Sequence, residues 1–144
     1  MAGSDFQVNV PSGFSNPDVR NLSDTEKGMA GAMGLSEEQF RQSKLEYLLR
    51  EERRRTRGRD HGEQVERILD EIGEGYRLSS VTWNTDTLSW RLEIETQQGP
   101  QNVVLSSELV DDALDARTRR ELQRVRNMVW FGLGRRDLIF EKHQ

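Results

Sequence analysis

The chain has 144 residues, of which 33% are hydrophobic and 32% charged, and its formal net charge is −4. A chain this short and polar can hold one small core and leaves other residues for extensions. It has no cysteine, which excludes disulfides and thiolate sites, and no apolar run near the ~20 residues of a membrane span.

The first five residues lack the basic and apolar blocks of a secretory signal. We therefore expect a protein of intracellular origin with no membrane partner.

Residues 1–22 are predicted to form an extended N-terminal arm, because prolines, glycine and asparagines interrupt any helical period. Spaced apolar side chains in such an arm can add a strand to a partner's sheet. The alternative is a floppy terminus whose apolar residues are incidental. The candidate partner-binding residues of the arm are Phe6, Val8, Val10 and Phe14.

Residues 23–61 are predicted to form a helical hairpin. The stretches 23–26 and 36–39 each have the capping-box pattern that begins a helix, and the first helix should end at Gly34. The second helix should run to about Arg57. Its expected apolar stripe is Phe40, Leu45, Leu48 and Leu49.

Residues 62–134 are predicted to form a small α-β-β-β-α domain, so that the fold class is α+β. A helix between Gly62 and Gly75 precedes strands at 76–83, 88–96 and 102–105, which form a three-stranded antiparallel meander. A helix from about residue 108 should break near 115 and continue through 130. The expected core is Leu78, Trp90, Leu92, Ile94, Val103, Leu105, Leu109, Leu114, Leu122, Val125 and Val129.

Residues 135–144 are predicted to form a C-terminal tail. Within it, residues 138–140 (Leu-Ile-Phe) form an extended segment or a partner-binding tail.

No catalytic signature is present. The only histidines, His61 and His143, have no second histidine at metal-binding spacing, and both are interpreted as exposed loop residues. Serines lack their usual base, and no phosphate-binding glycine loop occurs. We therefore expect no catalytic residue, no metal and no cofactor, and a small enzyme is the least favoured hypothesis.

Arginine is concentrated in two clusters: five arginines lie in 53–59 and seven in 117–136. The α-β-β-β-α order is that of double-stranded-RNA-binding domains, but the last helix begins with acidic residues where that family grips phosphate. The arginines of this helix are either a solvated face or an anionic docking surface, with Arg117, Arg120 and Arg124 as candidates. The alternative function is a nucleic-acid-associated regulator that uses clusters 53–59 and 117–126.

One segment resembles a known group of proteins. Leu22-Ser-Asp-Thr-Glu26, Ala32-Met-Gly-Leu-Ser-Glu-Glu-Gln-Phe40 and Ser43-Lys44 resemble a short stretch at the end of Mu-like head-maturation proteases and scaffolds of tailed phages. The resemblance covers about 23 of 144 residues and carries over no nucleophile. It implies a docking hairpin for another head protein, with Leu35 and Phe40 as candidate partner-binding residues.

Together these features predict a non-enzymatic structural or assembly protein of a phage-like particle, as an accessory head, connector or tail component. Its expected partners are other structural proteins of the particle, with which it oligomerises or assembles; nucleic acid is not favoured. The expected location is the host cytoplasm during assembly and then the virion.

Overall fold

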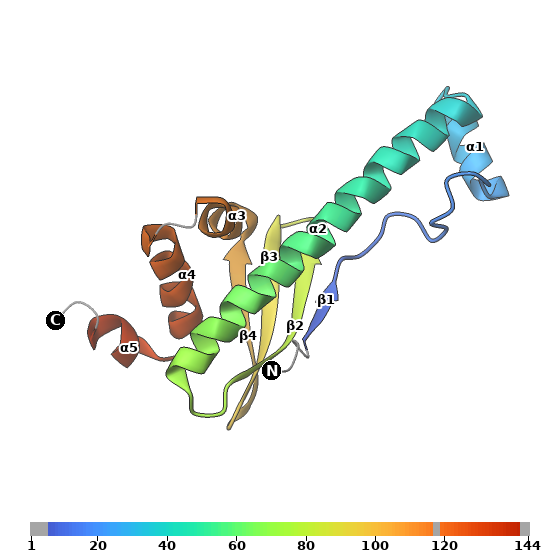
Figure 1. Ribbon diagram of the computed structural model, residues 1–144. Helices are drawn as coiled ribbons and strands as arrows, with labels where there is room; N and C mark the ends of the chain where they lie inside the picture. The colour runs from blue at the N-terminus through green and yellow to red at the C-terminus, as the bar shows by residue number, and fades with distance from the viewer. Residues whose placement is uncertain (1–5, 117–118, 142–144) are drawn as a thin grey trace. The chain divides into compact units, whose positions relative to one another are not determined.

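The computed structural model describes residues 6–116 and 119–141, and the chain is of mixed α and β structure, as predicted (Figure 1). It forms two compact units. The smaller unit comprises residues 11–54, and the larger unit comprises residues 1–10 together with 55–144.

The smaller unit contains the predicted helical hairpin. Helix α1 (Asp24–Ala32) begins with a capping box, in which Ser23 and Glu26 exchange hydrogen bonds between side chain and backbone. The turn after α1 contains Gly34, whose φ of 72° lies in the left-handed region that glycine adopts without strain. Ser36 then caps helix α2 (Glu37–Ile72): its hydroxyl accepts from the Gln39 backbone N–H at 3.1 Å.

Helix α2 continues without interruption to Ile72, so the prediction of one helix to about Arg57 and another after Gly62 is wrong. The two glycines that suggested a break lie inside the helix, where other side chains pack against its backbone. A Cβ at Gly58 would lie 2.7 Å from Val8 Cγ1, and a Cβ at Gly62 would overlap the ring of Phe6. This packing outweighs the ~1 kcal/mol that each glycine costs a helix.

The predicted antiparallel meander is present in the larger unit as β2 (Arg77–Asn84), β3 (Ser89–Thr96) and β4 (Gly99–Ser106). A fourth strand, β1 (Gln7–Asn9), pairs in parallel with β2, which gives the order β1-β2-β3-β4. Part of the predicted arm is therefore a strand of the chain's own sheet.

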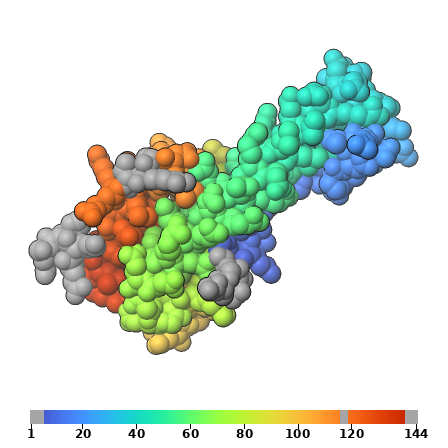
Figure 2. Space-filling view, viewed as in Figure 1, coloured from blue at the N-terminus to red at the C-terminus, as the bar shows by residue number. Residues whose placement is uncertain are grey.

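One face of this sheet is covered by the second half of α2, by α3 (Ser107–Ala116) and by α4 (Arg119–Gly132) (Figures 1 and 2). Of the predicted core, Leu109, Leu114 and Leu122 are half-buried and the other residues are buried. The core also contains residues that were not predicted: Val65, Ile68, Leu69, Val81, Trp83, Val110, Ala113 and Trp130.

The predicted extended segment at 138–140 is instead part of a short helix, α5 (Arg136–Glu141). Gly134, with a φ of 74°, turns the chain after α4, and the Arg135 N–H closes that turn by donating to the Trp130 carbonyl at 2.8 Å. Leu138 and Ile139 of α5 pack against the core.

Candidate protein-docking surfaces

The apolar residues at the start of the chain lie in the larger unit. Phe6 and Val10 pack against its core, and Val8 pairs with Val81 across β1 and β2. All three predicted partner-binding side chains are half-buried within the chain's own fold.

The fourth arm residue, Phe14, lies in the smaller unit with the two candidates from the hairpin. Phe14 and Leu35 pack against a small core in which Phe40 is buried. The ring centroids of Phe14 and Phe40 are 6.2 Å apart in an edge-to-face arrangement. The structure thus brings Phe14, Leu35 and Phe40 together as the inside of the hairpin.

A buried ion pair holds the hairpin together. Lys44 Nζ lies 2.5 Å from Glu26 Oε2 and donates to the Asp18 carbonyl at 2.8 Å. The Lys44 ammonium, followed by the hydrogen bond from the Ser23 backbone N–H, lowers the pKa of Glu26 to about 2. The pair therefore ties the segment before α1, and α1 itself, to α2.

Five large hydrophobic side chains of the smaller unit are exposed. Tyr47, at 40%, packs edge-on against Phe14, and the other four form two pairs. Met29 and Met33, at the end of α1, are 47% and 63% exposed, and Leu45 and Leu49 in α2 are 38% and 49% exposed. The residues of each pair are four positions apart, so Leu45 and Leu49 share one side of α2; Met33, the C-cap of α1, continues the side that carries Met29. Leu45 and Leu49 were predicted to face the core, which is wrong, and the two methionines were missed although their spacing was visible in the sequence.

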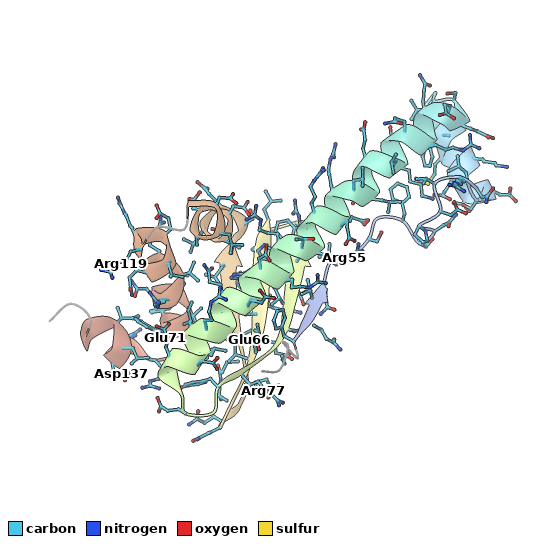
Figure 3. All side chains as sticks on the ribbon, in the orientation of Figure 1. Arg55, Glu66, Glu71, Arg77, Arg119 and Asp137 are labelled. Carbon is cyan, nitrogen blue, oxygen red and sulfur yellow. The ribbon has the colours of Figure 1, made fainter. Side chains whose placement is uncertain are left out.

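The two arginine clusters are partly neutralised by ion pairs within the larger unit. Arg57 lies 3.4 Å from Asp111 and 2.8 Å from Asp115 on α3. Arg126 on α4 contacts Glu71 of α2 at 3.2 Å, and Figure 3 shows Glu71 on the side of α2 toward α4. These arginines join the helices that cover the sheet.

The structure describes two of the three predicted docking arginines of the last helix. Arg120 and Arg124 are exposed on α4. Arg117 lies outside the described residues.

The sequence suggested that His61 is an exposed loop residue, and this prediction is wrong because α2 continues through His61. It is fully buried, with its ring centroid 6.4 Å from that of Trp90. Burial lowers the pKa of the imidazole to about 3, so it is neutral near pH 7. Within the described part of the chain neither ring nitrogen has a hydrogen-bond partner. His143 lies outside the described residues.

Among the described residues, no group of three or more His, Asp or Glu side chains could hold a metal ion. No helix within 6–116 and 119–141 is long and apolar enough to cross a membrane.

In comparisons with known proteins, no family model, no curated protein and no solved structure matches the chain.

Proposed function

We propose that the chain is a non-enzymatic assembly protein that binds other proteins through its smaller unit, as an accessory head, connector or tail component of a phage-like particle. The observation that carries this proposal is the pair of exposed apolar surfaces on the hairpin, Met29 with Met33 and Leu45 with Leu49. We call these four residues the hairpin surface.

Burial of apolar side chains at an interface removes apolar area from water. Each Å² buried contributes about 25 cal/mol of favourable free energy, which is offset in part by the entropy lost on association. Two exposed apolar side chains four residues apart on each of two helices differ from the single, scattered apolar residues of an ordinary protein surface. Methionine adapts its shape to a partner, which suits it to such surfaces. The helices beneath are held by the Glu26–Lys44 pair, so that little order has to be gained on binding.

The resemblance to phage head proteins covers the same hairpin. The shared residues Glu26, Leu35, Phe40 and Lys44 lie on its inside, where they form the small core and the ion pair. The resemblance therefore includes residues that build the hairpin, and it also includes Met33 of the exposed pair. This supports a docking hairpin whose contacts are made by the exposed side chains around that interior.

Nucleic-acid binding is the second candidate function. It is favoured by Arg120 and Arg124, which are exposed and have no ion pair among the described residues. Against it, Arg57 and Arg126 are already paired with carboxylates. A phosphate backbone would have to compete with these pairs, which reduces what Arg57 and Arg126 would contribute to phosphate binding.

The test is incorporation into particles. In cells that produce the assembled particle, the wild-type protein should co-sediment with it at a fixed copy number. The double variant Leu45→Glu with Leu49→Glu should fold, with a Tm close to that of the wild type, and be absent from the particle. The matched control is Val104→Glu, at an exposed apolar residue of β4, and should be incorporated normally.

Absence of the wild-type protein from purified particles would refute the proposal. So would incorporation of the double variant at the wild-type copy number.

A further inference from the structure

The outer side of α4 carries a second surface, in the larger unit. Arg120, Arg124, Met128 and Phe131 are spaced by four, four and three residues, which places them on one side of the helix. All four are exposed, Met128 by 40% and Phe131 by 55%. We propose that they form a docking surface for an acidic, amphipathic segment of a partner protein.

The opposite side of α4 is fixed to the rest of the larger unit. Val125 and Val129 are fully buried in the core, and Arg126 contacts Glu71 of α2. Because these contacts hold the inner side, the outer side is presented in one orientation. The stripe from Arg120 to Phe131 is roughly 16 Å long at ~1.5 Å per residue, which matches about three turns of a bound helix.

Charge complementarity identifies the partner as acidic. Helix α4 contains four arginines and one acid, Glu121. Of the arginines, Arg126 is paired with Glu71, whereas Arg120 and Arg124 have no ion pair within the described part of the chain. A guanidinium binds a carboxylate through two parallel hydrogen bonds, and two of them one turn apart suit carboxylates at the same spacing.

Met128 and Phe131 require an apolar part in the same partner. They continue the stripe beyond the arginines, so an amphipathic helix with acidic and apolar residues on one face would cover both parts. The guanidinium of Arg136 lies 5.5 Å from the centre of the Phe131 ring, over its face. One face of this ring is thus occupied, and Met128 offers no stacking plane, so the surface suits a protein better than stacked nucleic-acid bases.

The experiment uses a fluorescent 14-residue helical peptide with two glutamates and two leucines on one face. Its Kd is measured by anisotropy with the full chain. Binding should weaken at least about tenfold with Arg120→Glu plus Arg124→Glu, and also with Met128→Ser plus Phe131→Ser. The matched controls, Arg59→Glu and Val104→Ser, alter exposed residues elsewhere in the larger unit and should change Kd less than about twofold.

Thermal unfolding of every variant is measured beside its Kd, and the α4 variants should keep the wild-type Tm because their side chains are exposed. The proposal is overturned by no measurable peptide binding to the wild type, or by equal binding to wild type and α4 variants. Single-stranded DNA that binds more tightly than the peptide, through the same arginines, overturns it as well. The hairpin variant Leu45→Glu with Leu49→Glu should bind the peptide normally, which separates this surface from the hairpin surface.

Discussion

The contact between Phe6 and Gly62 can be tested by adding one methyl group to the helix. In Gly62→Ala the new Cβ would overlap the ring of Phe6. Overpacking of this kind costs about 1–3 kcal/mol, whereas replacing a helical glycine by alanine stabilises a helix by about 1 kcal/mol. The free energy of unfolding should therefore fall by up to about 2 kcal/mol.

The sign should reverse when the ring is removed. In the Phe6→Ala background the steric cost disappears, and Gly62→Ala should stabilise the larger unit by about 0.5–1 kcal/mol. The double-mutant cycle thus isolates the steric term, with an expected coupling of about 1–3 kcal/mol. Urea unfolding followed by tryptophan fluorescence measures it, since Trp83, Trp90 and Trp130 all lie in the core of this unit.

Equal destabilisation by Gly62→Ala in both backgrounds would show that the alanine meets something other than Phe6. Stabilisation in the wild-type background would show that the Phe6 ring does not lie on α2 in solution. Either result would remove the argument that the Phe6 ring packs against α2 at Gly62.

Four further outcomes follow from the structure. Gly28→Ala, where a Cβ would meet nothing within 4 Å, should stabilise the smaller unit by about 0.5–1 kcal/mol in a circular-dichroism melt. Trp90→Ala, at a residue only 1% exposed, should cost about 3–5 kcal/mol in urea unfolding, and a silent result would contradict the strand register. Folding lowers the pKa of Glu26 from 4.5 to about 2, so the stability that the ionised carboxylate contributes is fully present above pH 4.5 and is lost as the pH falls toward 2. Glu26→Gln should remove this pH dependence of the free energy of unfolding. His61, with a pKa lowered from 6.5 to about 3, takes up its proton more readily in the unfolded chain, so stability should fall from pH 6.5 to 3, and His61→Leu should flatten that slope.

The meander could be predicted because its signal is local. In β3 the alternation of apolar and polar residues places Trp90, Leu92 and Ile94 on one face, and all three are buried. A slip of one residue would expose the whole set, so the pattern fixes both the strand and its register. The segments on either side of this strand contain residues typical of turns, and these residues indicate where the strand begins and ends.

The continuity of α2 could not be predicted from local rules. Glycines at 58 and 62 favour a helix end when only neighbouring residues are considered. In the structure the missing side chains of these glycines leave space for Val8 and Phe6, which lie about 50 residues earlier in the chain and pack against the helix backbone. The same long-range contact explains His61, because a helix that continues through the glycines carries the imidazole into the core.

The sequence pattern also could not predict which sheet the N-terminal arm joins. The alternation at Gln7–Asn9 indicates an extended strand, and these residues do form one. Nothing in that pattern distinguishes a partner's sheet from the chain's own, and the pairing with β2 joins residues 73 apart. Similarly, the spacing of Leu45 and Leu49 shows that they share a helix face but does not show what covers that face.

The buried pair of Glu26 and Lys44 bears on how the hairpin surface would work. A buried ion pair contributes little net stability compared with apolar residues of similar size, because desolvating both charges offsets their attraction. Its hydrogen bonds are directional, however: Lys44 binds the Asp18 carbonyl, and Glu26 accepts from the Ser23 backbone N–H. These bonds fix α1 and the segment before it on α2 in one arrangement. Since rigid presentation reduces the entropy lost on binding, the pair favours a hairpin surface that is formed before its partner arrives.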